Sequence, residues 1–247
     1  MDELQQVKKR LEELAGRSAG RGAYVASEFL TPAEQALLLS LRLPAAFSLE
    51  GGYPQAERRI AWFGSEHTCG WAEEPPLLWL EIAPKSAKFA EDLAHRDFLG
   101  ALMHLGLRRE VLGDLLLRQG KAWLCCLDTV GEYICRQLET ERHTSVVVTP
   151  CPVPPEDALP QPKQAQIVVA SPRLDALVAA VYRLSRSESQ TLFDKELVFV
   201  NSLPARSPGF DAKPGDLISV RGHGRFYFDG IERETKKGRL RANVRVF

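Results

Sequence analysis

Apolar residues recur at helical and strand spacing along most of the chain. Residues 4–14 place leucine and valine on one helical face, and Gly16 is expected to end that helix. Residues 31–34, Thr-Pro-Ala-Glu, predict a second helix because they combine an N-cap threonine, a proline at the first helical position and a capping-box glutamate. A Gly-Gly-Tyr-Pro turn at 51–54 precedes a predicted strand at 57–63.

The middle of the chain alternates between apolar runs and helical periods. Gly106 is a predicted helix end and Asp128 a predicted N-cap. The expected elements are an apolar run at 77–83, a helix at 91–105, a short run at 115–117, a strand at 121–127, a helix at 128–140 and a strand at 144–149. This β-α-β-β-α-β order predicts a ferredoxin-like or RRM-like domain. Its third strand supplies only Trp123 for base stacking, so RNA binding by this sheet has weak support.

A proline-rich segment marks the clearest boundary. Residues 150–162 hold six prolines among thirteen residues, and we expect a semi-extended connector there with neither helix nor sheet pairing. The sequence therefore predicts an α+β protein. Its expected parts are a small N-terminal α/β domain at 1–75, the RRM-like domain at 76–149, the connector at 150–170 and a C-terminal domain at 171–247.

The C-terminal part begins with two predicted helices. Residues 174–181 give the first an apolar face, and Ser185 with Glu188 forms a capping box at the start of the second. The strands expected after them lie at 196–201, at 217–221 behind a turn at 213–216, and at 239–246. The last strand alternates arginine with apolar residues, which makes one of its faces basic.

Composition is ordinary for a globular protein, with 45% hydrophobic and 26% charged residues among 247. The 32 basic and 32 acidic side chains cancel overall, but they are unevenly distributed. Residues 172–247 carry 14 Lys and Arg against 9 Asp and Glu, a net +5, which leaves 18 against 23, a net −5, for residues 1–171. A basic C-terminal part is typical of proteins that bind nucleic acid.

No secretory signal or membrane span is evident. The N-terminus lacks the basic and apolar regions of a signal peptide, and no apolar run approaches the roughly 18 residues that cross a bilayer, so we expect a cytoplasmic protein. The five cysteines include no Cys-x-x-Cys pair, and the adjacent Cys125 and Cys126 must point to opposite faces of a strand. Reduced thiols are expected, with no metal and no cofactor.

Basic side chains recur at helix starts and strand ends in the C-terminal part. There they can reach phosphate while staying exposed, and helix N-termini add backbone N–H groups. These residues are Arg173, Arg183, Arg186, Lys195, Arg221 and Arg225. A solvated face of scattered charge has the same composition, so charge alone does not decide between the two readings.

The order of the C-terminal segments resembles the S4 RNA-binding domain, or αL motif. The segments that carry the resemblance are 173–175 (Arg-Leu-Asp), 184–187 (Leu-Ser-Arg-Ser), 198–201 (Val-Phe-Val-Asn) and 214–220 (Pro-Gly-Asp-Leu-Ile-Ser-Val). The resemblance implies recognition of the RNA backbone by the second helix and the adjoining strand. It assigns this role to Arg173, Ser185, Arg186, Ser187, Gln190, Lys195 and Asn201, beside the cations Arg221 and Arg225.

Upstream segments resemble the bacterial YlmH family, and this resemblance covers nearly the whole chain. The segments are 29–35, 51–59, 95–102 (His-Arg-Asp-Phe-Leu-Gly-Ala-Leu) and 105–114. The resemblance implies an N-terminal domain, an RRM-like domain and an S4 domain in a factor that binds ribosomal RNA of the large subunit with peptidyl-tRNA during rescue of stalled translation. A related branch occurs in cyanobacteria and plastids.

Arg108 and Arg109 follow the helix predicted at 91–105. They either complement the dipole of that helix or contact RNA phosphate.

Two other classes of function stay open. An RNA-modifying enzyme, such as a pseudouridine synthase or an rRNA methyltransferase, is disfavoured because residues 1–149 lack a Gly-x-Gly-x-x-Gly loop. The large catalytic domain of such enzymes also normally follows the S4 domain, which here extends to Phe247. A protein-interaction adaptor that uses the acidic N-terminal part is the second alternative. The prediction is a monomeric, non-enzymatic RNA-binding protein without catalytic residues, with ribosomal RNA, the large subunit and tRNA as candidate partners.

Overall fold

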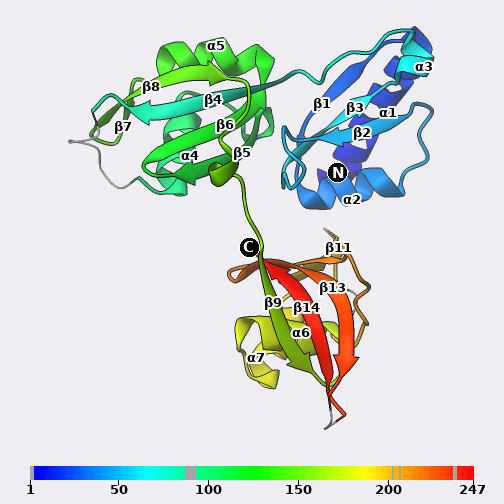
Figure 1. Cartoon of the computed structure of the whole chain (residues 1–247). Coiled ribbons are helices and arrows are strands. Elements are labelled where there is room, and N and C mark those ends of the chain that lie inside the picture. Colours follow the sequence, from blue (N-terminus) through cyan, green and yellow to red (C-terminus); the bar gives the residue numbers. More distant parts are fainter. Residues whose placement is uncertain (1–2, 87–92, 202, 206, 236–237) are drawn as a thin grey trace. The chain divides into compact units, whose positions relative to one another are not determined.

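The computed structural model describes residues 3–86, 93–201, 203–205, 207–235 and 238–247. The chain divides into two compact units, Met1–Pro160 and Gln161–Phe247. Each contains both helices and antiparallel sheets, which agrees with the predicted α+β class (Figure 1). Among the described residues, no helix is long and apolar enough to cross a membrane.

The first unit opens with a three-stranded antiparallel sheet in the order β1-β3-β2. Its elements are α1 (Glu3–Arg21), β1 (Val25–Leu30), α2 (Pro32–Ser40), β2 (Phe47–Glu50), β3 (Arg59–Phe63) and the short α3 (Glu66–Cys69). Leu11 and Leu14 of α1 pack with Leu38 of α2 and Phe63 of β3 in one buried cluster. The capping box predicted at Thr31 and Glu34 is confirmed at the start of α2.

Helix α1 continues past Gly16, so the predicted end at that residue is wrong. The first residue with a left-handed backbone is Gly22, at φ +57°. The final turn also gains packing and a hydrogen bond, because Ser18 is buried and its Oγ donates to the carbonyl of Ala23 at 2.8 Å. These contacts offset the cost of about 1 kcal/mol that glycine carries inside a helix.

A five-stranded antiparallel sheet in the order β5-β6-β4-β8-β7 completes the first unit. Its elements are β4 (Leu77–Pro84), α4 (His95–His104), η2 (Arg109–Val111), β5 (Leu112–Arg118), β6 (Lys121–Leu127), α5 (Asp128–Gln137), β7 (Thr140–Glu141), β8 (Thr144–Cys151) and η3 (Glu156–Ala158). The predicted β-α-β-β-α-β order is present, with β7 as an additional short strand. Residues 91–92 of the helix predicted at 91–105 lie outside the described residues, and α4 itself begins at His95.

The two faces of this sheet have different coverings. One face packs against α4 and α5 through Phe98, Leu102 and Ile134. The opposite face carries Trp79 and Trp123, which are buried in a cluster with Phe29 and Ile60 from the N-terminal sheet. Both faces are therefore used for packing inside the first unit.

The second unit has a six-stranded antiparallel sheet in the order β11-β10-β12-β13-β14-β9. Its elements are β9 (Lys163–Val169), α6 (Leu174–Tyr182), α7 (Arg186–Asp194), β10 (Val198–Val200), β11 (Leu203–Pro204), β12 (Leu217–Val220), β13 (Gly224–Glu234) and β14 (Leu240–Val246). The core unites Leu177 and Val178 of α6 with the inward residues Ile218, Phe226 and Val244. The helices thus cover one face of this sheet.

The connector expected at 150–170 is much shorter in the structure. Pro150 lies opposite Leu80 in the pairing of β8 with β4, beyond the part of β8 that β7 covers, so no N–H is required on that edge. At the other end, β9 pairs with β14 along all seven of its residues. The prolines end at Pro162, and residues 163–169 can therefore donate to a sheet.

Candidate nucleic-acid interface

The start of α7 brings together several of the predicted RNA-binding residues. Ser185 is the N-cap: its Oγ accepts from the N–H of Glu188 at 3.2 Å, and Glu188 Oε2 accepts from the N–H of Ser185 at 2.7 Å. Hydrogen bonds from the backbone and the side chain of Ser185 to the Glu188 carboxylate lower the pKa of Glu188. The predicted capping box is confirmed, and it fixes the first turn of α7 at the surface.

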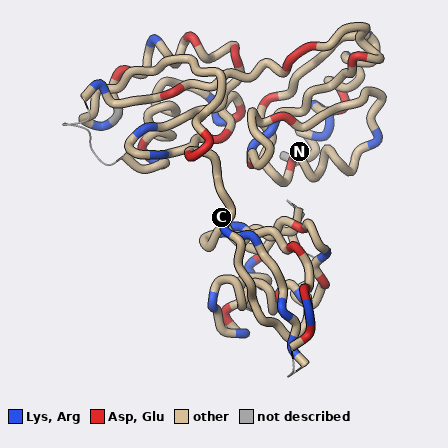
Figure 2. The backbone as a smooth tube through the Cα atoms, viewed as in Figure 1, with Lys and Arg blue, Asp and Glu red and all other residues tan. Residues whose placement is uncertain are grey.

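Exposed polar and basic side chains surround this capped turn. We define the α7 surface as Arg183, Arg186, Ser187, Gln190 and Lys195, all of which are exposed. Arg183 takes a left-handed backbone at φ +54° at the end of α6, two residues before the N-cap of α7. Lys195 is the C-cap at the far end of α7, and Gln190 donates to Asp194 at 3.0 Å. Figure 2 shows basic positions on both the helices and the strands of this unit.

A buried contact orients α7. Ser189 is fully buried, and its Oγ donates to the carbonyl of Asp175 in α6 at 2.9 Å. The carboxylate of Asp175 accepts two hydrogen bonds from Arg173, at 2.8 and 3.1 Å, which raise the pKa of Arg173. Arg173 therefore serves first as the partner of Asp175, whereas Arg186 has its charge at the surface.

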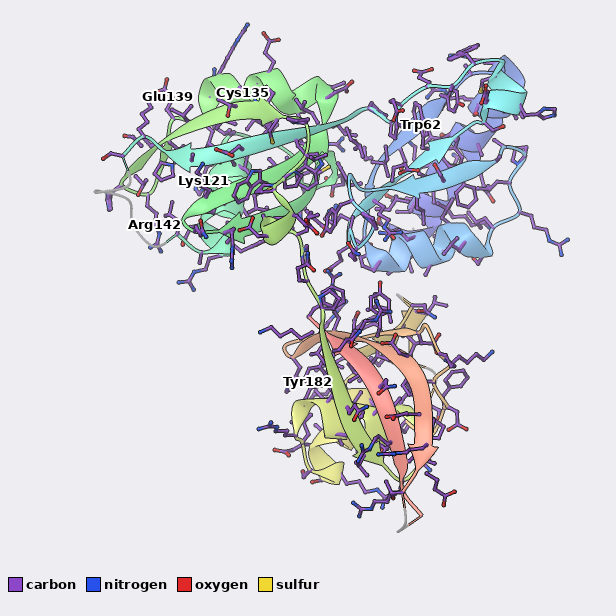
Figure 3. All side chains as sticks on the ribbon, viewed as in Figure 1. Trp62, Lys121, Cys135, Glu139, Arg142 and Tyr182 are labelled. Carbon is purple, nitrogen blue, oxygen red and sulfur yellow. The ribbon has the colours of Figure 1, made fainter. Side chains whose placement is uncertain are left out.

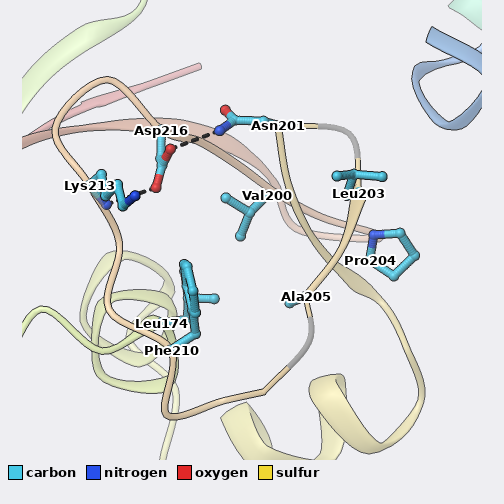
Figure 4. Close-up of a pocket in the computed structure, with 9 residues that line it drawn as sticks. All are labelled: Leu174, Val200, Asn201, Leu203, Pro204, Ala205, Phe210, Lys213 and Asp216. Atoms are coloured by element: carbon cyan, nitrogen blue, oxygen red, sulfur yellow. Dashed lines mark hydrogen bonds between the residues drawn. The ribbon is translucent and has the colours of Figure 1, made fainter. Parts of the chain in front are cut away.

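Asn201 has a structural task in the hairpin that follows β10. Its Nδ2 donates to Asp216 at 2.7 Å (Figure 4). Its Oδ1 accepts from the N–H of Leu217 at 2.9 Å, and its own backbone has φ +48°. These bonds hold the hairpin against β12. Beside them lies a pocket of about 270 Å³, and two of its lining residues, Leu203 and Phe210, are exposed.

Arg221 and Arg225 lie on the other side of the sheet from the helices. Their neighbours Val220 and Phe226 point into the core, and side chains alternate between faces along a strand. Arg221 stacks on the ring of Phe199, and Arg225 stacks on the ring of Phe247. The structure thus separates the predicted residues of this unit into a helix side and a sheet side.

The remaining predicted pair, Arg108 and Arg109, belongs to the first unit. Arg108 is exposed and forms an ion pair with Glu28. Arg109 donates from Nη1 to the carbonyls of Leu112 and Gly113, at 2.5 and 3.1 Å. Burial lowers the pKa of Arg109 to about 10, and the nearby positive charge of Arg58 adds to this shift. Arg109 is therefore committed to the backbone around it, and Arg108 is the better placed of the two to meet phosphate.

Trp123 illustrates why the sheet of the first unit is a poor platform for bases. This aromatic on the third strand is 5% exposed, because Ala158 and residues from the N-terminal sheet pack over it. A stacking ring must be reachable by a base. Base stacking on this sheet had only weak support from the sequence, and the burial of Trp123, the one aromatic residue of the strand, agrees with that.

The cysteines behave as core residues. Cys125 and Cys126 are buried in different clusters on opposite faces of β6, as predicted, and burial raises the pKa of Cys126 to about 12. Within the described ranges, no group of three His, Cys, Asp or Glu side chains is arranged to hold a metal ion.

The sequence interpretation missed β13, and with it the outward ring of Tyr227. The signal was present in 224–228, Gly-Arg-Phe-Tyr-Phe, where aromatic residues alternate with other positions after a glycine turn.

The family model and the curated relative that match this chain identify its family. Residues 78–154 match the family model described as "Putative RNA-binding domain in YlmH". The chain is 30% identical over 225 residues to ribosome-associated protein quality control protein P2 of Bacillus subtilis, covering 87% of this chain and 84% of that protein. The solved structure of cell division protein ylmH from Streptococcus pneumoniae has a TM-score of 0.49 and 20% identity, covering 62% of this chain and 93% of the other. The chain therefore belongs to the YlmH family.

Proposed function

We propose that this protein binds RNA and associates with the ribosome, and that the α7 surface docks on ribosomal RNA of the large subunit. Support comes from the match to an RNA-binding domain model and from the relative in Bacillus subtilis, whose name describes ribosome association and protein quality control. We propose further that the protein works in the cytoplasm as a monomer and contacts complexes that contain peptidyl-tRNA during translation quality control.

The observation that carries the docking proposal is the start of α7. Ser185 and Glu188 satisfy two backbone N–H groups of the first turn, while Arg186 and Ser187 stay exposed beside the positive end of the helix dipole. Arg183 adds a second cation at the same end. A phosphate group placed there meets charged donors and a favourable dipole without displacing any core residue.

We propose further that the two units follow the architecture implied by the family. The second unit then serves as an S4 domain, with α6, α7 and β10 as its RNA-binding part. The strand order β5-β6-β4-β8 with helices on one face supports the proposal that the middle domain is ferredoxin-like, and hence RRM-like. The other face of its sheet is buried, so RNA would contact this domain through its edges and loops, and Arg108 is a candidate for that contact. Binding of this kind needs no catalytic residue.

The test is sedimentation of a cell lysate through a sucrose gradient at low and high salt. The wild type is expected to migrate with the large subunit at low salt, and an Arg186→Ala, Lys195→Ala double variant is expected to stay near the top. A Lys8→Ala, Lys9→Ala variant is the matched control, because it removes two charges from α1, where each lysine forms an ion pair with a glutamate on the same helix. Co-migration of the α7 double variant with the subunit would contradict the proposed surface.

A further inference from the structure

The uncovered face of the six-stranded sheet in the second unit carries an ordered set of rings and arginines. Phe199 lies opposite Ser219, which lies opposite Arg225, and Tyr227 lies opposite Arg245. Cross-strand partners share a face, so these side chains project together on the side away from α6 and α7. We define the aromatic–arginine face by its six members, which are Phe199, Arg221, Arg225, Tyr227, Arg245 and Phe247.

Each ring of this face is paired with a guanidinium group. The Cζ atom of Arg221 lies 4.8 Å from the centroid of the Phe199 ring, and that of Arg225 lies 4.5 Å from the Phe247 ring. Arg245 lies 4.6 Å from the ring of Tyr227. The rings of Tyr227 and Phe247 are themselves 5.7 Å apart, so these two pairs adjoin one another. Stacking holds the arginines in place and lowers the entropy that they lose on binding.

The core does not need these rings. Phe226 and Phe228 point inward from the same strand and are fully buried, whereas Tyr227 and Phe247 are half-buried. An outward strand face in a small antiparallel sheet is ordinarily polar. Aromatic side chains interleaved with arginine are instead the composition of surfaces on which bases stack.

Charge across the face is uneven. Arg245 is neutralised by Asp229, to which it donates three hydrogen bonds of 2.9 to 3.1 Å. Arg221 is exposed and, among the residues that the structure describes, forms no ion pair. The end of the face near β12 and β10 therefore offers a cation to a phosphate, while Tyr227 and Arg245 offer a flat, nearly neutral stacking surface.

We propose that the aromatic–arginine face binds unpaired RNA, stacking bases on its rings and guanidinium planes and placing a phosphate against Arg221. This inference rests on the proposed RNA-binding function and assigns it a second surface. The α7 surface offers cations and helix N–H groups but no aromatic ring, which suits the backbone of structured RNA. In this proposal, the helix side of the unit binds structured RNA and the sheet side binds unpaired RNA.

The test is fluorescence anisotropy on the full chain with two labelled probes, an unstructured oligouridylate of about ten nucleotides and a blunt RNA hairpin. Tyr227→Ala is expected to weaken oligouridylate binding about tenfold, within the range found for loss of one base–aromatic stack, and to leave hairpin binding unchanged. Tyr227→Trp keeps a stacking ring and is expected to retain binding. Arg186→Ala is expected to show the reverse selectivity, weakening the hairpin more.

Val168→Ala is the matched control, because Val168 is an exposed apolar residue of the same sheet, opposite Arg241, without a ring. Thermal melting of each variant separates loss of binding from loss of folding. Equal oligouridylate affinity for folded Tyr227→Ala and the wild type would overturn the inference and leave a protein partner as the explanation of this face. In that case, hairpin binding that is weakened by Arg186→Ala would still support the proposed binding of structured RNA by the α7 surface. Failure of the wild type to bind either probe would count against both.

Discussion

The phenol of Tyr53 donates a hydrogen bond to the carboxylate of Asp114 at 2.7 Å across 61 positions of sequence. The same carboxylate accepts from the backbone N–H groups of Glu57 and Arg58, at 2.7 and 3.0 Å. Asp114, near the start of β5, thus accepts hydrogen bonds from the backbone of the turn that precedes β3. One side chain joins the two sheets of the first unit.

Replacing Asp114 with asparagine is expected to destabilise the first unit by about 1–3 kcal/mol, because an amide has one acceptor oxygen where three donors converge. The measurement is urea unfolding followed by tryptophan fluorescence, which reports on this unit because all four tryptophans lie between residues 62 and 123. Asp157→Asn is the control, since Asp157 is exposed and, within the described part of the chain, its one ion pair is with Arg118. Equal unfolding midpoints for the two variants would contradict the role of Asp114.

Tyr182, labelled in Figure 3, predicts a pH effect in the second unit. Its hydroxyl is buried and has no hydrogen-bond partner among the described residues, and burial raises its pKa to about 12. The folded pKa lies above the ordinary value of about 10, so the unfolded chain loses its proton first. This contribution to stability is therefore complete below about pH 10 and is lost as the pH rises toward 12.

Tyr182→Phe is expected to raise the free energy of unfolding by up to about 1 kcal/mol at neutral pH, because it removes an unsatisfied hydroxyl. It should also flatten the loss of stability above pH 10. Thermal melts monitored by circular dichroism between pH 8 and 11 measure both effects. A variant that is less stable than the wild type would show that the hydroxyl has a partner in solution.

Cysteine labelling is expected to follow burial. Cys69, Cys125 and Cys126 are buried, and burial raises the pKa of the thiols of Cys125 and Cys126. Cys135 and Cys151 are half-buried. Iodoacetamide at pH 8 should therefore label Cys135 and Cys151 first in the native protein, and all five only after denaturation. Peptide mass spectrometry reads this order, and early labelling of Cys125 would contradict the packing of β6.

Salt dependence is expected to report on the α7 surface. The logarithm of the affinity for structured RNA should fall linearly with the logarithm of salt concentration, because bound cations release counterions from phosphate. Arg186→Ala should reduce the slope by about 0.7–0.9, the value for one lost phosphate contact, and weaken binding similarly for different sequences. An unchanged slope would place Arg186 outside the interface.

The enzyme alternative has its own test. Mass spectrometry of ribosomal RNA from cells with and without the protein is expected to show the same modifications. Loss of one modification in the cells that lack the protein would replace the binding function with a catalytic one.

Local rules were sufficient for the capped helices of this fold. Ser185 with Glu188, and Thr31 with Glu34, each fix a helix start within four residues, and the structure reproduces both. Long-range pairing was not visible in the same way. Strand β9 looked like part of a connector because its ladder partner, β14, lies more than seventy residues away in sequence.

The candidate site shows the same limit. The sequence located Arg173, Arg186 and Arg225 as cations, but not which of them are committed to other groups. Arg173 is bound to Asp175 and Arg109 to backbone carbonyls, and these assignments depend on neighbours that only the fold brings close. Similarly, Tyr227 and Arg245 stack on each other because β13 and β14 are neighbours in the sheet, which the sequence alone does not show.

The burial of Trp123 has a consequence for how mutations in this protein would be read in a genetic screen. Because this ring is part of the internal packing of the first unit, its variants should lower the amount of protein in the cell. Variants of Arg186 should leave that amount unchanged and lower only the activity per molecule. A deep mutational scan that measures abundance and function in parallel would therefore place these two residues in opposite classes, although both would score as loss of function in a growth assay alone.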